Sequence, residues 1–365
     1  MESVNEVHLR GVTCGRTISF PITRGGLGCR KKGNNMTKPI RWGILGAAKF
    51  AREHMAPAIH AAKGAELAAI ATSSPEKAAP FRAFAPGLKT HASYDALLAD
   101  ATIDAVYIPL PNHLHVEWTL KALAAGKHVL TEKPICLRAD EIAKIIAARD
   151  ASGLLAAEAY MIVHHPQWHR ARELVQSGAI GSLTHVDGVF SYDNRSDPGN
   201  IRNKADTGGG GIYDIGVYTY GSARFVTGAE PESLSCVMRQ ENGVDVWAQV
   251  TGLMAGPLGR YTYSAITSMR LHNRQEMTFH GDKGVIRLTA PFNPNVFAEA
   301  QLELRQGMSV TTERWPGVNH YVLQVENFGD SIRGGTPYAC PLEFTYGTAA
   351  MIDMAFANAS VISLA

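Results

Sequence analysis

From residue 40 to about residue 160, short apolar runs alternate with longer amphipathic stretches. This alternation is typical of βαβ units, in which helical crossovers join buried parallel strands. Five or six strands connected in this way predict a doubly wound parallel sheet. The expected strands cover 40–45, 66–72, 105–108, 127–131 and 154–159, and the expected helices cover 49–62, 75–84, 94–99, 113–125 and 138–151.

After about residue 160 the pattern changes to strand-like segments separated by tight-turn signals such as Glu241-Asn242-Gly243. Successive strands joined by tight turns predict antiparallel pairing. We therefore expect an α/β domain at 39–160, followed by an α+β domain at 161–365 with a large, mostly antiparallel open sheet. Its expected helices cover 166–177, a stretch after the glycines at 208–211, 320–333 and 345–360, and its expected strands cover 232–239, 244–254, 258–267, 274–280 and 284–290.

The first residues of the chain differ from the rest. Residues 1–35 lack hydrophobic periodicity and carry a surplus of basic side chains. We interpret 1–38 as a disordered extension, or as a stretch translated ahead of a true start at Met36. A targeting peptide is the alternative, although a secretory signal needs an apolar core that is missing here.

Composition excludes several classes of function. The formal net charge is +2, and the basic surplus of residues 1–35 accounts for it, so we expect no nucleic-acid partner. We find no apolar run long enough to span a bilayer, so we expect no membrane partner. Five scattered cysteines form neither a disulfide framework nor a zinc spacing, which favours a reducing, cytoplasmic setting.

The first expected strand is followed by a turn that resembles a dinucleotide-binding fingerprint. The three glycine positions of that fingerprint fall on Gly46, Ala48 and Ala51, so one glycine of three is present. Amides at the start of the next helix would hold a diphosphate. A plain strand-to-helix turn remains the alternative for this motif alone. The residues expected to contact the cofactor here are Gly46, Ala47, Ala48, Lys49 and Phe50.

The end of the second strand indicates which nicotinamide cofactor binds. An NAD site favours a carboxylate at this position, for the ribose hydroxyls. This chain offers Ser73, Ser74 and Lys77, whose amides and ammonium group could receive a 2′-phosphate, while Glu76 is expected to lie one turn into the helix. We therefore predict NADP, with NAD as the alternative.

Three residues are candidates for acid–base chemistry. Lys133 follows a buried strand, at the sheet edge where open α/β proteins bind ligands. Asp214 and Tyr218 are four positions apart and share a helix face. A nearby ammonium group would lower the pKa of the tyrosine and favour its phenolate. The alternative is structural, with Tyr218 as a core aromatic residue and Asp214 as an acid at a helix start.

The order of four motifs resembles the Gfo/Idh/MocA oxidoreductase family, and within it the glucose–fructose oxidoreductase and aldose dehydrogenase branch. The resemblance extends from Ile40 to the C-terminus and implies a Rossmann cofactor domain and homodimers or homotetramers built through the C-terminal sheet. The motifs are the glycine turn, Tyr107-Ile108-Pro109-Leu110-Pro111-Asn112-His113-Leu114-His115, Glu132-Lys133-Pro134, and Gly209-Gly210-Gly211 with Asp214 and Tyr218.

The resemblance also implies roles for individual residues. It places Leu110, Pro111, Asn112, His115 and Glu132 beside the cofactor, together with Lys133. It makes Lys133, Asp214 and Tyr218 the catalytic residues. The expected substrate contacts are Tyr160, His165, Arg202, Asp214 and Tyr218.

The function predicted from these motifs is NADP-dependent oxidation of an aldose at C1 to a lactone. A tightly held cofactor could be reoxidised in place by a second sugar. The alternatives are a trans-dihydrodiol or inositol-type carbinol dehydrogenase and, in another class, a non-catalytic NAD(P)-sensing regulator. We expect no metal, because the neighbouring histidines His164, His165 and His169, or His113 and His115, lack an acidic ligand at helical spacing.

Overall fold

A six-stranded parallel sheet forms the first part of the fold. The computed structural model describes residues 38–363, so the interpretation of residues 1–35 lies outside it. The strand order is β3-β2-β1-β4-β5-β6, which is the doubly wound order predicted from the sequence. Ligands bind such sheets at the carboxyl ends of β1 and β4, where the strand order reverses. The strands are β1 (Ile40–Leu45), β2 (Ala65–Ala71), β3 (Lys89–His91), β4 (Ala105–Ile108), β5 (His128–Glu132) and β6 (Ala156–Ala159).

Helices connect these strands and begin where the sequence supplies caps. The side chains of Ser74 and Ser93 accept hydrogen bonds from first-turn amides and so act as N-caps. Gly153 ends one helix in the left-handed conformation. The helical segments are η1 (Ala51–Met55, a π-helix), α1 (Ala56–Ala61), α2 (Pro75–Arg82), α3 (Tyr94–Leu98), η2 (Asn112–Leu114), α4 (His115–Ala124) and α5 (Ala139–Ser152).

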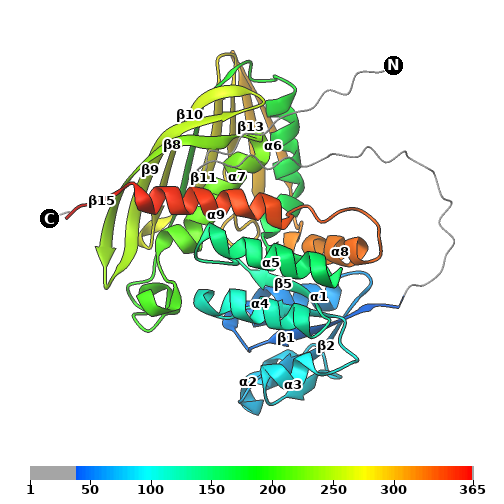
Figure 1. Ribbon diagram of the computed structural model, residues 1–365. Helices are drawn as coiled ribbons and strands as arrows, with labels where there is room; N and C mark the ends of the chain where they lie inside the picture. The colour runs from blue at the N-terminus through cyan, green and yellow to red at the C-terminus, as the bar shows by residue number, and fades with distance from the viewer. Residues whose placement is uncertain (1–37, 364–365) are drawn as a thin grey trace, which may run out of the picture. The chain divides into compact units, whose positions relative to one another are not determined.

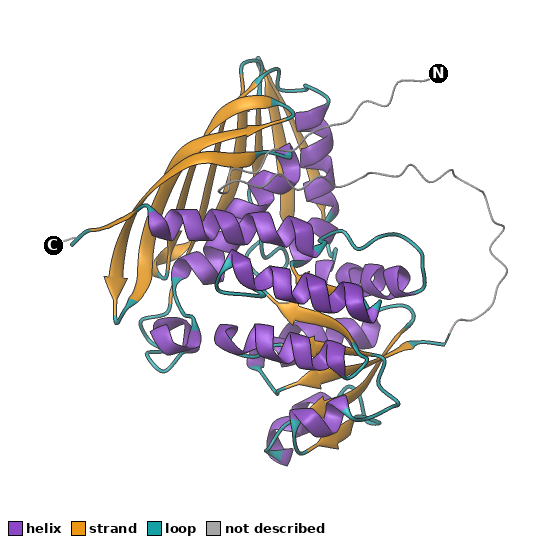
Figure 2. Cartoon of the chain, viewed as in Figure 1, coloured by secondary structure: helices purple, strands orange, loops and turns teal. Residues whose placement is uncertain are grey.

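A nine-stranded sheet forms the second part (Figures 1 and 2). Its order is β14-β13-β12-β11-β7-β10-β9-β8-β15, and its neighbours are antiparallel except for the parallel pairs β7–β10 and β8–β15. The strands are β7 (Leu183–Asp193), β8 (Glu230–Glu241), β9 (Val244–Gly256), β10 (Gly259–Ser268), β11 (Arg270–Gly281), β12 (Val285–Leu288), β13 (Ala300–Gln306), β14 (Ser309–Trp315) and β15 (Ala359–Val361).

Helices cover one face of the nine-stranded sheet and connect it to the first sheet. Figure 1 shows α9, in red, between the strands of the second sheet and α5, and α8 near α1. Contacts of α9 with α5 and β6, and of α8 with α1, bear this out. The helical segments are η3 (Met161–His164), α6 (Pro166–Gln176), η4 (Ile201–Asn203), η5 (Ala205–Thr207), η6 (Ile212–Gly216, a π-helix), α7 (Val217–Thr227), α8 (His320–Ile332) and α9 (Leu342–Ala357).

An aromatic cluster fills the space between α6, α7 and the second sheet. Phe190 stacks on Phe292 with ring centroids 5.0 Å apart, and Trp168 stacks on the other side at 6.2 Å. The ring of Tyr218 lies within 6 Å of Phe190, Phe292 and Tyr160. Aromatic side chains bury large areas, so this cluster contributes strongly to the core.

The predicted fold class is confirmed, with errors in individual elements. Strands β3, β7, β13, β14 and β15 were not expected. The expected mostly antiparallel sheet is confirmed, although β7, which lies between β11 and β10, runs parallel to β10. The sequence pattern also gave no sign that α8 and α9 return to contact the first sheet and its helices.

A buried arginine ties α7 to α9 and yields a prediction about stability. The guanidinium of Arg224 donates two hydrogen bonds to Glu230 and two more to the Phe344 carbonyl and the Thr348 hydroxyl. We expect Arg224→Ala to lower the free energy of unfolding by about 2–3 kcal/mol in urea titrations, because buried acceptors lose their donor.

The matched control is Arg260→Ala. Arg260 also pairs with a glutamate, but its side chain is 69% exposed. An exposed pair of this kind contributes less than about 1 kcal/mol. Equal losses of stability in the two variants would contradict the role assigned to Arg224.

Candidate active site

The turn after β1 offers a site for a diphosphate. Gly46 has a φ of +103°, and a Cβ atom there would lie 3.2 Å from Leu110 and 3.3 Å from the Tyr94 hydroxyl. The turn therefore requires glycine in both its backbone conformation and its space. The helix that follows begins at Lys49, and its first-turn amides lack intrahelical partners, so they favour an anion. Ala47, Ala48, Lys49 and Phe50 all retain some exposure, so these residues fit a dinucleotide.

The end of β2 carries both a group that favours NADP and a carboxylate that favours NAD. Ser74 caps α2 by accepting from the Lys77 amide at 3.4 Å, while Ser73 and Lys77 are exposed. Contrary to expectation, the Glu76 carboxylate reaches back to the cap, where it accepts from the Ser74 hydroxyl at 2.7 Å. That hydrogen bond lowers the pKa of Glu76. Both a lysine and a carboxylate thus lie at the end of β2, where they could meet the 2′ group of a bound cofactor.

His115 joins two loops that border the cofactor edge. Its Nε2 lies 2.7 Å from the Leu110 carbonyl, and its Nδ1 lies 2.7 Å from the Pro134 carbonyl. The side chain is fully buried, and burial lowers its pKa to about 4. The neutral ring donates only one of these bonds at a time. His115 therefore orders the segments of Leu110 and Lys133 from behind.

Asn112 connects the same edge to the second part of the chain. Its side-chain amide donates to the Gly208 carbonyl at 2.8 Å, and Pro111 precedes it at the partly exposed start of η2. One residue from this loop thus contacts the glycine run 208–211 that leads into η6. The loop after β4 and the glycine run lie side by side at the cofactor edge.

Lys133 lies at the carboxyl end of β5 and contacts Asp214. Its Nζ donates to the backbone carbonyl of Asp214 at 2.5 Å and to the Oδ1 atom of the same residue at 3.1 Å. The preceding residue, Glu132, accepts from the Tyr107 hydroxyl at 2.5 Å, and burial raises the pKa of Glu132. The carboxyl end of β5 and the segment η6 therefore meet at a lysine–aspartate pair.

Asp214 collects three donors from different elements. Besides Lys133, the Arg202 guanidinium lies 2.9 Å from Oδ2, and the Tyr192 hydroxyl donates to Oδ2 at 2.6 Å. Burial alone would raise the pKa of Asp214, but Arg202 and Lys133 outweigh it and hold the pKa well below its usual range. Asp214 is therefore charged, and it orients Lys133 and Arg202 toward one another.

Tyr218 lies beside Lys133, but not in the expected electrostatic setting. The Lys133 Nζ lies 4.7 Å from the centroid of the Tyr218 ring, over its face. The tyrosine is 5% exposed, and its hydroxyl contacts the Met161 Sδ at 3.5 Å. Burial raises the pKa of Tyr218 well above 10, with added repulsion from Glu132 and Tyr321. The pKa of Tyr218 is therefore raised, where the sequence predicted that it would be lowered, because burial disfavours the phenolate.

Two expected substrate contacts, Tyr160 and His165, are buried. The Tyr160 hydroxyl donates to the carbonyls of Val217 and Tyr218 at 3.1 Å, so this residue supports α7 from behind. His165 caps α6 by accepting from the Gln167 amide, and its ring faces Trp315 and His320. Neither residue contacts the Lys133–Asp214 pair in the described part of the chain. Their contact with substrate stays a prediction.

The sequence analysis missed two tyrosines at this site. Tyr192, which bonds to Asp214, lies on the unexpected strand β7. The alternation of Val186, Phe190 and Tyr192 is the signal for this strand, and Gly188 weakens it. Tyr321, at the start of α8, packs its ring against Phe50 and His54 near the cofactor turn. No sequence signal connects position 321 with position 50.

The comparisons with known proteins agree with this geometry. A parallel sheet with a glycine turn at its switch point and a lysine–aspartate pair at the same edge defines an NAD(P)-dependent oxidoreductase. Residues 40–160 match the GFO/IDH/MocA oxidoreductase family with its NAD-binding Rossmann fold, and residues 168–287 match the GFO/IDH/MocA C-terminal domain. The chain belongs to this family.

Individual relatives extend over most of the chain. An uncharacterized oxidoreductase, ORF334 of Rhizobium meliloti, is 38% identical over 86% of this chain and 95% of its own length. D-xylose 1-dehydrogenase (NADP+) 2 of Haloferax volcanii is 32% identical over 88% of this chain and 97% of its own length.

A solved structure shares the fold. KijD10, a 3-ketoreductase of Actinomadura kijaniata in complex with NADP and TDP-benzene, superimposes with a TM-score of 0.80 and 27% identity. The match covers 90% of this chain and all of KijD10. That protein has also been solved with a tyrosine replaced by phenylalanine and with a lysine replaced by alanine.

The position of His115 predicts an effect on cofactor binding. We expect His115→Phe to raise the Kd for NADPH about tenfold, because the carbonyl that the ring N–H satisfies loses its donor and the loop of Leu110 and Asn112 loosens. Fluorescence titration of NADPH measures this change. The exposed neighbour supplies the control, since His113→Ala should leave the Kd unchanged. An unaltered Kd in His115→Phe would show that the loop needs no such support.

Proposed function

We propose that this chain is an NADP-dependent sugar oxidoreductase that oxidises an aldose at C1 to a lactone. The observation that carries the proposal is the Lys133 ammonium, held between the Asp214 carboxylate and the Tyr218 ring at the carboxyl edge of the parallel sheet. In this proposal residues 39–160 bind the dinucleotide and residues 161–365 bind the sugar. A relative named for oxidation of xylose supports the substrate class.

The residues divide the chemistry between them. The bound nicotinamide supplies a hydride acceptor at its C4 atom. Asp214 is charged and, with Arg202, orients hydroxyl groups of the sugar. Tyr218 takes the proton of the C1 hydroxyl as the C1–H hydride leaves and the C1–O double bond forms. Because burial raises the pKa of Tyr218, the phenolate that this step requires must be stabilised by the Lys133 ammonium over the ring face.

The proposed cofactor is NADP rather than NAD. The exposed Lys77 and the amides at the start of α2 suit a 2′-phosphate. A relative named an NADP+-linked xylose dehydrogenase and the structure of KijD10 in complex with NADP support the same choice. Glu76 must then turn away from Ser74, and its exposed position at the first turn of α2 allows this.

Reduction of a sugar ketone is the second candidate. The raised pKa of Tyr218 favours it, because a neutral phenol is ready to donate a proton to a carbonyl oxygen as hydride arrives at the adjacent carbon. The relation to KijD10, named a 3-ketoreductase, supports the same direction. In an aldose–aldose reaction both directions alternate on one cofactor, so Tyr218 serves as base and acid in turn.

The proposal includes a homodimer or homotetramer in the cytoplasm. The face of the second sheet away from its helices carries a hollow to which four strands contribute. It is lined by the apolar side chains Val189, Trp247, Ile266 and Leu271 and by the polar side chains Ser191, His272, Asn273 and Arg274. Apolar groups gathered on an open sheet face suit a self-association surface. The buried free thiols Cys136, Cys236 and Cys340 suit a reducing compartment. Among residues 38–363, no helix is long and apolar enough to cross a membrane.

A substrate panel tests the reaction. We expect NADP-linked oxidation of xylose or glucose to exceed that of inositol and of a cyclic trans-diol by at least about tenfold in kcat/KM, and NADP to exceed NAD by a similar factor. Absorbance at the nicotinamide band follows both. Activity confined to ketone reduction would select the second candidate, and a strong NAD preference would overturn the cofactor assignment.

Two substitutions test the proposed chemistry. Lys133→Ala and Tyr218→Phe should each lower kcat by at least about 100-fold, because each removes a group from the proton transfer. Circular dichroism and NADPH binding check that the fold survives. The controls Lys121→Ala and Tyr346→Phe remove exposed side chains of the same types and should leave kcat unchanged. A near-normal kcat in either Lys133→Ala or Tyr218→Phe would contradict the proposed mechanism.

A further inference from the structure

Two carboxylates outside the reacting cluster are buried without an ion pair in the described part of the chain. Asp245, on β9, is 2% exposed, and Glu158, on β6, is 3% exposed. Burial raises the pKa of each to about 7. Carboxylates are rarely fully buried without a paired cation. A carboxylate that is buried without one needs hydrogen-bond donors instead. The donors that these two have found are backbone amides.

Asp245 holds the start of the helix that carries Asp214 and Tyr218. Its Oδ2 accepts from the Ile212 amide at 2.7 Å, and the Gly211 amide also faces the carboxylate. A Cβ atom on Gly210 would lie only 2.3 Å from Oδ1, so the glycine run lets the carboxylate approach the helix end. An anion is favoured at a helix N-terminus. Asp245 thus fixes the backbone two positions before Asp214.

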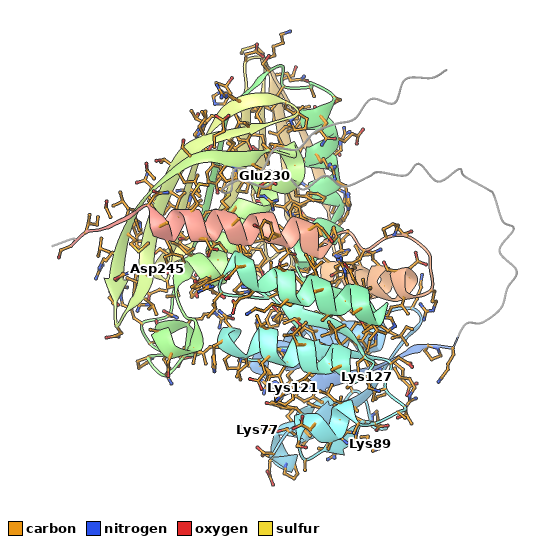
Figure 3. The ribbon with its side chains drawn as sticks, viewed as in Figure 1. Lys77, Lys89, Lys121, Lys127, Glu230 and Asp245 are labelled. Carbon is orange, nitrogen blue, oxygen red and sulfur yellow. The ribbon has the colours of Figure 1, made fainter. Side chains whose placement is uncertain are left out.

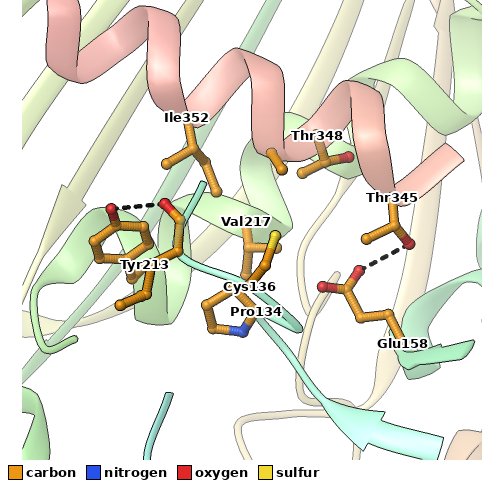
Figure 4. A pocket seen from close by; sticks show the side chains of 10 residues that line it. Pro134, Cys136, Glu158, Tyr213, Val217, Thr345, Thr348 and Ile352 are labelled. Carbon is orange, nitrogen blue, oxygen red and sulfur yellow. Dashed lines mark hydrogen bonds between the residues drawn. The ribbon is translucent and has the colours of Figure 1, made fainter. Parts of the chain in front are cut away.

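Glu158 holds the other side of the site in the same way. Its Oε1 accepts from the Ile135 amide at 3.0 Å, two positions after Lys133, and Thr345 on α9 donates to its Oε2 at 3.3 Å. Figure 4 shows Glu158 and Thr345 facing each other beside Pro134. In the same view the Tyr213 hydroxyl donates to the Leu137 carbonyl at 3.0 Å, so the two segments are also bonded directly.

Lys133 and Asp214 depend on these two segments. The shorter of the two Lys133 bonds goes to the backbone carbonyl of Asp214, at 2.5 Å, so the main chain at position 214 sets where its acceptor lies. A shift of either segment would lengthen this bond and the bond to Oδ1. We propose that Asp245 and Glu158 are positioning residues, each anchoring by a buried carboxylate–amide bond one of the two segments that bring Lys133 to Asp214. The inference rests on the proposed function only in the catalytic role that this function gives to Lys133 and Asp214.

The test measures how well Lys133 is held, without any substrate. The full chain is treated briefly with acetic anhydride, and acetylation of individual lysines is quantified by peptide mass spectrometry. The side chain of Lys133 is 9% exposed, so its Nζ should react slowly. Lys127 (Figure 3) is the internal reference, since it is also buried and its Nζ donates to the carbonyls of Asp100 and Ile103 in the loop before β4.

The expected result is a selective change at Lys133. Asp245→Ala and Glu158→Ala should each raise the Lys133-to-Lys127 labelling ratio at least about tenfold, because the local segment opens. Asp245→Asn and Glu158→Gln keep one acceptor oxygen and should raise the labelling ratio about threefold. These two variants test the inference if the alanine variants do not fold. The matched control is Asp282→Ala, which removes a carboxylate–amide bond to Ser182 away from the site and should leave the ratio unchanged.

Two outcomes would overturn the inference. An unchanged ratio in the folded Asp245 and Glu158 variants would show that Lys133 needs neither anchor. An equal rise at Lys133 and Lys127 would show general destabilisation instead of positioning. With a sugar that the wild type oxidises, kcat should fall at least about tenfold while the Kd for NADPH stays within twofold. If the wild type oxidises no sugar, the proposed function fails, and the labelling ratio still decides the role of the carboxylates.

Discussion

The bond between Lys133 and Asp214 is the interaction on which the arrangement of the site depends. Lys133 ends a strand of the parallel sheet, and Asp214 begins the helix that packs on the antiparallel one. A buried ammonium group is stable only with acceptors around it, so the segments that carry the two residues must stay in contact. The Arg202 and Tyr192 contacts complete the partners of Asp214. The fold thus brings its two halves together at the place where a sugar and a nicotinamide would meet.

Much of the first sheet could be predicted because its information is local. Each strand is a short apolar run, each crossover is a helical stretch, and Gly46 and Lys133 occur in motifs of a few residues. The second sheet was harder because its central strand β7 interrupts the inward alternation with Gly188. A Cβ atom at Gly188 would lie 2.4 Å from the sulfur of Met277, on the neighbouring strand β11. Met277 is far from Gly188 in the sequence, yet it leaves room only for glycine there. This glycine makes the strand hard to recognise from the sequence.

The sequence indicated some members of the candidate site but not its electrostatics. Spacing alone indicated that Asp214 and Tyr218 share a face, and the motif indicated Lys133. The pKa of Tyr218 depends instead on Phe190, Phe292 and Tyr160, which bury its ring from separate elements. Tyr192 and Tyr321 reach the site through tertiary contacts between segments far apart in the chain. Burial and long-range packing are properties of the folded chain, and no single window of sequence contains them.

The π-helical turn at Ile212–Gly216 has a consequence for how the lysine is held. In a wide turn of this kind each amide bonds to the carbonyl five positions back, as Val217 does to Ile212, so the regular bonding of the following α-helix is interrupted. Such an interruption gives a main-chain carbonyl a chance to accept from a side chain, and Asp214 offers its carbonyl to Lys133. Of the two hydrogen bonds that Lys133 donates to Asp214, one therefore goes to the main chain. Exchanging the side chain at position 214 removes the carboxylate and its charge but leaves in place the oxygen that lies closest to the ammonium group.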